Sequence, residues 1–315
     1  MRARATILSR QRVYIPFSGR LPAGLWMHAA CRPVTIAANN LVGHLARVSV
    51  RLVPSRSTQF VPWIPAPPWL RIASALGLRE GDFVAFRPSD PRRARMLLLT
   101  LDQQRRPVLL AKISKLPPNP LADLALSRLQ GNTNFRVPKV RDVWEEDGWW
   151  ISIEDPLPPG PHRPSRLTPV ERVGLCSAIA ESVPEHASAT EAIIHGDFAP
   201  WNVREFAKTG LAILDWDDAC RGPRASDALW YAMSSRLIRK YSQRRVFSET
   251  VRELSEFYPP DDLVRAANFW LNRWTAADSA EVIPDIPKSK SLLALEIRRN
   301  RVLEQMANLS SQTLA

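Results

Sequence analysis

Two carboxylates and one amide in a short segment are the residues of this chain best suited to chemistry. Asp197 and Asn202 lie in HGDFAPWN (195–202), and Asp215 lies in AILDWD (212–217). Phosphoryl transfer needs an oxygen nucleophile in line with the γ-phosphate and cations that neutralise the spreading charge. A carboxylate beside a hydroxyl can orient it and accept its proton, and Mg²⁺ prefers oxygen ligands. The three residues therefore predict transfer of phosphate from a nucleotide to a hydroxyl.

A short hairpin is expected to bring these residues together. The chain from Val203 to Leu214 can form a short hairpin that turns at 207–210. It would return Asp215 to face Asn202 across the nucleotide phosphates. A His-x-Asp pattern with Asn five residues after the Asp is also the catalytic-loop pattern of protein-kinase-like folds.

The elements around this segment change from strands to helices along the chain. Apolar runs predict strands at 95–101, 108–114, 137–144 and 149–153, with a helix at 119–129 between the two pairs. A proline-rich break follows at 156–164. Thr168-Pro169-Val170-Glu171 is a capping box that starts a helix running to about Ser182, and several more helices are expected from 225 to 314.

This order predicts an α+β, two-lobed fold. Residues 81–155 would form a small β-rich N-lobe, and residues 156–315 a larger helical C-lobe that carries the catalytic loop. Residues 1–80 are Arg-rich and Pro-rich, and they form an additional basic N-terminal segment.

The segment 195–227 resembles the Brenner-type motif of the aminoglycoside phosphotransferase and choline kinase family. That family shows HGDxxxxN, a hydrophobic strand, DWE or a near variant, and a later Asp that opens a helix; this chain has HGDFAPWN, AILDWD and Ser226-Asp227-Ala228. The resemblance implies a protein-kinase-like fold, ATP or GTP as the phosphate donor and Mg²⁺ as the metal. It implies that Asp197 is the catalytic base and that Asn202 and Asp215 are the metal ligands.

The same resemblance implies a nucleotide-binding set in the β-rich lobe. Lys112 matches the lysine that contacts the α- and β-phosphates, and Asp123, on the following helix, occupies the place of the acid that pairs with it. Ile153 and Asp155, at the end of the last strand of this lobe, complete the expected cofactor contacts. His195 matches an architectural position, and Asp227 is expected to tie down the catalytic loop.

Two departures from the family pattern support an alternative. Asp123 is shorter than the usual Glu, and the expected nucleotide-covering loop at 86–93 contains no glycine, although glycines normally let the backbone approach phosphates. Ser89, Arg92 or Arg93 would have to contact the phosphates instead. The alternative function is a catalytically weak or inactive kinase-like protein that binds nucleotide or serves as a scaffold.

Composition limits the partners. The formal net charge is +12, but the arginines of residues 1–80 are scattered singly, which does not favour nucleic acid. Peripheral contact of residues 1–80 with a membrane stays open, and no apolar run is long enough to predict a spanning helix. The three cysteines lie far apart, so a reduced, cytoplasmic protein is expected. The sequence does not indicate an oligomeric state.

The acceptor is expected to be a small molecule with a hydroxyl group. A polycationic aminoglycoside would require an acidic binding site, and the helical region after Asp218 contains no compact acidic run. A sugar-like acceptor is therefore favoured. Trp270 and Trp274 lie four residues apart on one helical face; a cation cage is one interpretation, and core packing is the preferred one.

Overall fold

The computed structural model describes residues 5–7, 12–14, 74–77, 83–87, 95–101, 107–156, 162–206, 210–238, 241–279 and 290–308. The chain divides into two compact units. The first contains residues 1–118 and 138–161, and the second contains residues 119–137 and 162–315. Within the described ranges, no helix is both long and apolar enough to cross a membrane.

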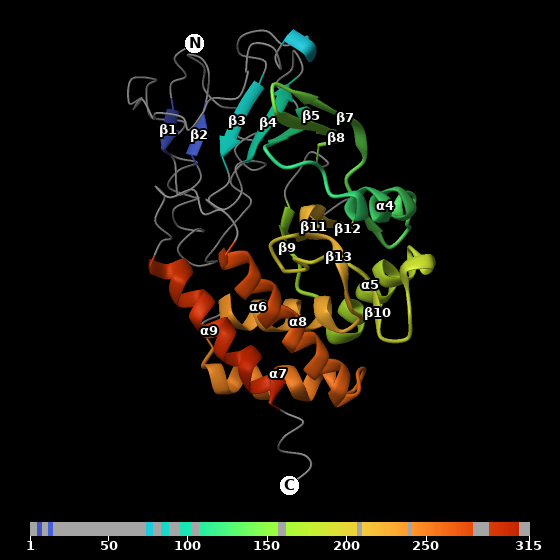
Figure 1. Cartoon of the computed structure of the whole chain (residues 1–315), viewed down its shortest axis with the longest axis vertical. Coiled ribbons are helices and arrows are strands. Elements are labelled where there is room, and N and C mark those ends of the chain that lie inside the picture. Colours follow the sequence, from blue (N-terminus) through green and yellow to red (C-terminus); the bar gives the residue numbers. More distant parts are fainter. Residues whose placement is uncertain are drawn as a thin grey trace. The chain divides into compact units, whose positions relative to one another are not determined.

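The first unit is built on an antiparallel sheet (Figure 1). Its strands are β1 (Ala5–Ile7), β2 (Arg12–Tyr14), β3 (Phe83–Arg87), β4 (Arg95–Leu101), β5 (Pro107–Ser114), β7 (Val140–Glu146) and β8 (Trp149–Glu154), in the spatial order β1-β2-β3-β4-β5-β8-β7. The four strands expected between 95 and 153 are all present. Residues 5–7 and 12–14 of the basic N-terminal segment extend the same sheet, which sequence reasoning did not foresee.

The two faces of β5 and β8 differ, because successive side chains of a strand point to opposite sides. Ala111, Ile113 and Ile151 are fully buried on one face, and Lys112 lies on the other, opposite Ser152 in the register. The β7–β8 hairpin turns at Asp147-Gly148, whose φ values of 51° and 70° are those of a two-residue turn that matches strand twist.

The second unit begins with helix α4 (Pro120–Leu129) and strand β6 (Phe135–Arg136). Sequence reasoning had placed both in the β-rich lobe. They group with the second unit because β6 pairs in parallel with β12 (Gly210–Ile213) and because Asn119, the N-cap of α4, donates to carbonyls near Asp217. The sheet β6-β12-β11-β9 also contains β11 (Val203–Phe206) and β9 (His162–Pro164).

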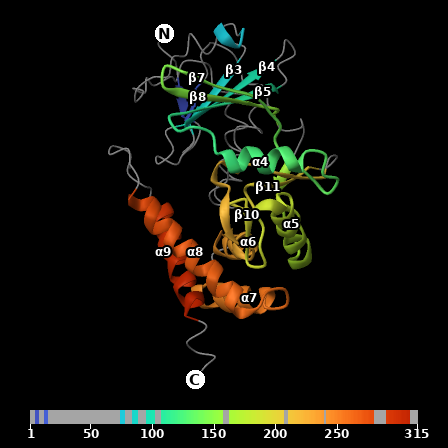
Figure 2. The same ribbon diagram turned by 45° about the vertical axis from the view of Figure 1, so that its right-hand side comes forward.

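Longer helices also belong to the second unit. They are α5 (Pro169–Glu181), α6 (Ser226–Ile238), α7 (Gln243–Leu254), α8 (Pro260–Ser279) and α9 (Lys290–Ala307). The predicted capping box starts α5, since Thr168 and Glu171 satisfy each other's backbone N–H groups. Helices α8 and α9 lie side by side in two views (Figure 1, Figure 2), and both contact α6.

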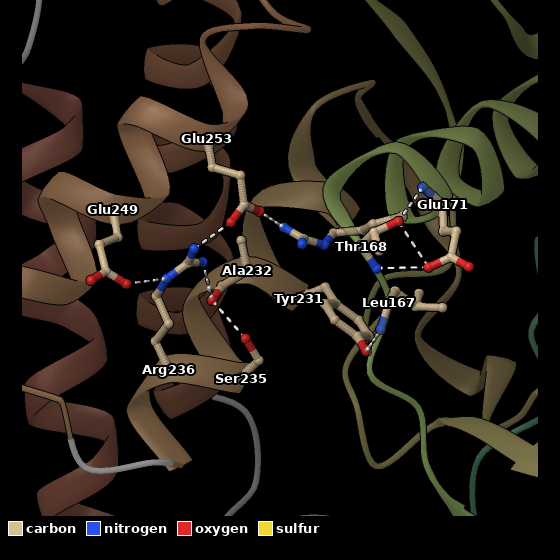
Figure 3. Close-up of polar contacts among 10 residues, drawn as sticks. Leu167, Thr168, Glu171, Tyr231, Ala232, Ser235, Arg236, Glu249 and Glu253 are labelled. Atoms are coloured by element: carbon tan, nitrogen blue, oxygen red, sulfur yellow. Dashed lines mark hydrogen bonds and ion pairs between the residues drawn. The ribbon is translucent and has the colours of Figure 1, made fainter.

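A buried ionic network joins three of these helices. Glu253 of α7 pairs with Arg172 of α5 and with Arg236 of α6, and Arg236 also pairs with Glu249 (Figure 3). The Arg172 side chain is only 4% exposed. Buried charges are stable only when paired, so this network fixes α5, α6 and α7 in one arrangement.

Candidate active site

Two short strands hold the ends of the candidate catalytic loop. Strand β10 (Glu191–Ile194) delivers the chain directly to His195, and it pairs with β13 (Cys220–Pro223), which follows the Asp215 segment. Between them, β11 and β12 form the predicted hairpin, with Val203 opposite Ile213. Leu214, the residue before Asp215, donates its backbone N–H to the Asn202 carbonyl at 2.9 Å. The hairpin therefore brings Asp215 beside Asn202 as expected.

Asp227 ties down the start of this loop. Its carboxylate accepts the backbone N–H groups of His195 and Gly196, at 2.6 Å and 3.1 Å. Burial raises the pKa of Asp227 to about 7, while these two N–H groups and the nearby charge of Arg273 act in the opposite direction. The expected role of Asp227 in holding the catalytic loop thus agrees with its hydrogen bonds.

His195 is an architectural residue in this site. Its ring is buried, its Nε2 lies 2.9 Å from the Leu214 carbonyl, and its Nδ1 accepts the Asp197 N–H at 3.2 Å. These partners require a neutral ring with the proton on Nε2. The indole of Trp216 packs against it at a centroid distance of 4.7 Å. His195 thereby links the Asp197 turn to the strand before Asp215.

Asn202 presents its amide group to Asp197 in a defined orientation. The Nδ2 atom donates to the Asp197 carbonyl at 2.9 Å and to Asp197 Oδ2 at 2.7 Å. An amide oxygen in that place would face two acceptors, so the orientation follows from chemistry. The Asn202 amide and the Asp215 carboxylate both offer oxygen donors, and their role as metal ligands stays a prediction. These residues fit Mg²⁺, which binds one or two protein ligands and completes its shell with phosphates and water.

Asp215 occupies a strained backbone position. Its φ of 66° and ψ of 59° are left-handed, which is uncommon for a residue other than glycine and is frequent at functional sites. The 3₁₀ helix η2 (Trp216–Asp218) follows it. The Arg273 side chain donates to the Asp218 carbonyl at 2.7 Å, and Asn119 Nδ2 donates to the Asp217 and Ala219 carbonyls at 3.1 Å and 2.5 Å. Two side chains from distant parts of the chain thus hold the turn that presents Asp215.

Lys112 forms an ion pair within the first unit. Its Nζ lies 2.7 Å from Glu154 Oε1, and both side chains are mostly buried. Glu154 follows Ser152, the cross-strand partner of Lys112, by two residues and so shares its face of the sheet. Sequence reasoning did not propose this acid. The expected partner, Asp123, lies on α4 in the second unit, and its pairing with Lys112 stays a prediction.

The other two expected nucleotide contacts lie in different surroundings. Ile153 is 3% exposed and belongs to the buried face of β8, opposite to the face of Lys112. Asp155 pairs with Arg141 at the surface, and its N–H donates to the Lys139 carbonyl at 2.9 Å. Both have structural roles in the first unit, and their contact with a nucleotide stays a prediction.

Three further expectations meet the structure only in part. Phe86 and Arg87 of the glycine-free segment 86–93 belong to strand β3, and residues 88–93 lie outside the described residues. Trp270 is fully buried, which agrees with core packing, and the side chain of Trp274 lies outside the described set. In the described part of the chain, no cluster of three or more His, Cys, Asp or Glu side chains is arranged to hold a metal. The predicted metal ligands are only two, Asn202 and Asp215, and one of them is an amide, so the metal role of this pair stays a prediction.

Sequence reasoning missed two side chains that contact the site. Asn119 was recognised only as the start of a helix, and Trp230 was not singled out at all. The Trp230 indole donates to Asp197 Oδ1 at 3.0 Å. Its position three residues after Asp227 was an available signal, because Asp227 was already expected to lie against the catalytic loop.

The fold and the catalytic-loop geometry define the class of protein. The fold is that of protein-kinase-like phosphotransferases, as the sequence predicted. Among solved structures, an amicoumacin kinase, hAmiN, in complex with AMP-PNP, Ca²⁺ and Ami aligns over 76% of this chain and 94% of its own, with 8% identity and a TM-score of 0.51. At that identity the likeness concerns the fold alone.

Two other solved structures align less closely. A thermostable mutant of aminoglycoside phosphotransferase APH(4)-Ia, in its apo form, aligns over 75% of this chain and 98% of its own, with 11% identity and a TM-score of 0.45. Choline kinase LicA from Streptococcus pneumoniae aligns over 67% and 90%, with 12% identity and a TM-score of 0.37. These scores are too low to carry an argument.

The family comparison covers the candidate site. Residues 108–250 match the model of the phosphotransferase enzyme family, a range that includes Lys112, Asp197, Asn202 and Asp215. The resemblance seen in the sequence is confirmed, and the match supports a phosphotransferase that acts on a small molecule. A search of curated proteins gave no match.

Proposed function

We propose that this protein transfers the γ-phosphate of ATP or GTP to a hydroxyl group of a small, sugar-like molecule. The observation that carries the proposal is the arrangement at Asn202. Its amide nitrogen donates to the Asp197 carboxylate, and its backbone carbonyl accepts the N–H of Leu214, the residue before Asp215. These bonds support a base at Asp197 with oxygen ligands for a metal at Asn202 and Asp215.

The proposed reaction follows from this arrangement. The acceptor oxygen forms a bond to the γ-phosphorus, and the bond from that phosphorus to the β–γ bridging oxygen breaks, with its electrons leaving on the nucleoside diphosphate. Asp197 orients the hydroxyl and accepts its proton. Asn202 and Asp215 would hold Mg²⁺, which neutralises phosphate charge when bound. Lys112 would contact the α- and β-phosphates.

The acceptor class is inferred from charge. The helical region after Asp218 contains no compact acidic run that would attract a polycationic aminoglycoside, and its acids Glu249 and Glu253 pair with arginines. These features support a neutral or anionic acceptor. A hydroxyl-bearing sugar or saccharide intermediate meets this condition.

The test is nucleotide-dependent phosphorylation of a panel of neutral sugars, anionic sugars and aminoglycosides by the full chain. The expected result is transfer to a sugar, dependent on Mg²⁺, with a loss of at least about a hundredfold in Asp197→Ala. Full activity in that variant would contradict the assignment of the base. Transfer to aminoglycosides alone would contradict the acceptor class.

The alternative function, a kinase-like protein that binds nucleotide without catalysis, is distinguished from an enzyme by nucleotide binding without phosphate transfer. A rise in melting temperature with ATP and Mg²⁺ reports binding whether or not transfer occurs. A rise without transfer to any acceptor would favour a nucleotide-binding scaffold over an enzyme.

A further inference from the structure

The Asp197 carboxylate receives hydrogen bonds on both of its oxygens. Asn202 Nδ2 donates to Oδ2 at 2.7 Å, and the Trp201 indole is 3.5 Å from the same atom. The Trp230 indole, from helix α6, donates to Oδ1 at 3.0 Å. An indole N–H can only donate, so Asp197 Oδ1 is the acceptor, and the bond favours this one orientation of the side chain. The terminal torsion of an aspartate is otherwise broad, and donors on both oxygens remove that freedom.

Trp230 is itself held in place on several sides. It is 4% exposed and stacks on Trp270 of α8, with ring centroids 4.7 Å apart. The Trp270 indole donates to the Ser226 carbonyl at 2.9 Å, which fixes that ring to the start of α6. The Arg299 guanidinium of α9 lies 5.4 Å from the Trp230 ring centroid, within range for a cation–π contact. These contacts hold the Trp230 indole in place, with its N–H directed at Asp197 Oδ1.

The Arg299 guanidinium lies where it can polarise the Trp230 indole. A cation over the ring draws electron density toward itself, and we expect this to make the N–H end more positive. Hydrogen bonds to a charged acceptor are about twice as strong as those between neutral groups. The bond from Trp230 is thus a directional constraint on the proposed base, supported from helices α8 and α9.

We propose that Trp230 is a positioning residue for Asp197, which it holds through its indole N–H with support from Trp270 and Arg299. This inference rests on the proposed function, because it assigns Trp230 to the same reaction. Trp230 is too deeply buried to bind the acceptor itself. Its effect should appear in turnover rather than in the binding of either substrate, since small errors in the placement of a reacting group cost rate.

The decisive variant changes only the N–H group. Replacing Trp230 with β-(3-benzothienyl)alanine puts sulfur in the place of N–H and retains the shape of the ring, its stacking and its cation–π contact. We expect kcat to fall by about tenfold, the value for a lost bond to a charged group. KM for nucleotide and for acceptor should stay within about twofold. An unchanged kcat would overturn the proposal, as would a loss confined to KM.

Trp270→Phe is the matched control. It removes a buried indole hydrogen bond of nearly equal length from the same stack, but that bond goes to the Ser226 carbonyl and not to Asp197. Trp230→Phe should lower kcat much more than Trp270→Phe, at similar losses of melting temperature. Because Trp270→Phe keeps an aromatic ring against Trp230, the stack that supports Trp230 remains. Equal losses of kcat would then show that the N–H bond to Asp197 adds nothing to packing, which would overturn the proposal.

A spectroscopic measurement keeps the inference separate from the proposed function. In the ¹H–¹⁵N spectrum of the full chain, the Trp230 indole signal should lie downfield because its acceptor is charged. It should move upfield in Asp197→Asn, while the Trp270 signal moves little. This result would support the contact even if no acceptor were phosphorylated, in which case the proposed function fails alone. If the chemical shift of the Trp230 indole stayed the same in Asp197→Asn, the inference would be overturned even if the enzyme were active.

Discussion

The backbone of Gly196 lies against the carbonyl of Asp218. A Cβ atom added to Gly196 would come within 1.9 Å of that oxygen, and φ at this position is +78°. The turn before Asp197 and the turn after Asp215 therefore meet at a point where no side chain fits. Gly196→Ala should destabilise the fold and abolish phosphate transfer, because one of the two turns must move.

Gly131→Ala is the control for this prediction. Gly131 has a similar φ of +82°, but nothing lies within 4 Å of an added Cβ. Gly131→Ala should lower the free energy of unfolding only by the penalty of a left-handed backbone, about 1–2 kcal/mol. Urea unfolding and the transfer assay measure both variants. Equal destabilisation by the two substitutions would show that the close approach to Asp218 is unimportant.

The raised pKa of Asp227 predicts a pH dependence of stability. The native state keeps this proton up to about pH 7, whereas the unfolded chain loses it near the ordinary value of 3.8. The native state therefore binds more protons in that interval, and the contribution of Asp227 to stability falls as pH rises from about 4 to 7. In Asp227→Asn this contribution disappears. The unfolding free energy should then decline less, or rise more, with pH than in the wild type.

Glu253 should show the opposite behaviour. Burial raises the pKa of Glu253, but the charges of Arg172 and Arg236 outweigh burial and lower it overall. The stabilisation is present above the ordinary pKa of a glutamate and is lost as pH falls. Glu253→Gln should remove part of the acid-side loss of stability. Denaturant titrations at a series of pH values from about 3 to 8 measure the unfolding free energy of both variants. Parallel pH profiles for Asp227→Asn and Glu253→Gln would contradict the opposite pKa shifts assigned to the two residues.

The network around Glu253 should matter for stability and not for chemistry. Glu253→Ala leaves the buried guanidinium of Arg172 without this partner, which typically costs about 3–5 kcal/mol. Arg245→Ala removes an exposed pair with Glu249 and should change stability little. Chemical denaturation distinguishes the two. At a temperature where both variants are folded, kcat should match the wild type.

Asn119 combines a helix cap with a tether to the Asp215 turn. Its side-chain oxygen accepts the Leu121 N–H, and its nitrogen donates to the carbonyls of Asp217 and Ala219. Asn119→Ser keeps a capping oxygen and loses the tether, and Asn119→Ala loses both. Both variants should lower kcat by a similar factor, and the alanine variant should be less stable by about a further 1 kcal/mol. Activity in Asn119→Ser equal to wild type would show that the tether has no role.

Local patterns predicted most of the elements. Strands β4 and β5, the capping box of α5 and the hairpin that returns Asp215 were all foreseen, because apolar runs, capping and turn residues act over short distances. Asp197, Asn202 and Asp215 were assigned from a motif within one segment. In the structure, Asp197 and Asn202 precede the β11–β12 hairpin, and Asp215 follows it.

Contacts between distant residues were not predictable in the same way. Glu154 pairs with Lys112 through the register of two strands, and a one-residue change in register would put it on the other face. Trp230 reaches Asp197 because α6 packs behind the catalytic loop. A single sequence contains the propensity of each segment but does not state which segments become neighbours.

The chain passes between its two units three times, after residues 118, 137 and 161. No single cleavage can separate the units. A fragment that ends at 118 would leave β5 without its neighbour β8, and one that starts at 162 would leave β12 without β6. During synthesis, β6 emerges well before the hairpin strand with which it pairs. The edge of the catalytic hairpin is therefore completed only after strand β12 has been made, about 75 residues after β6.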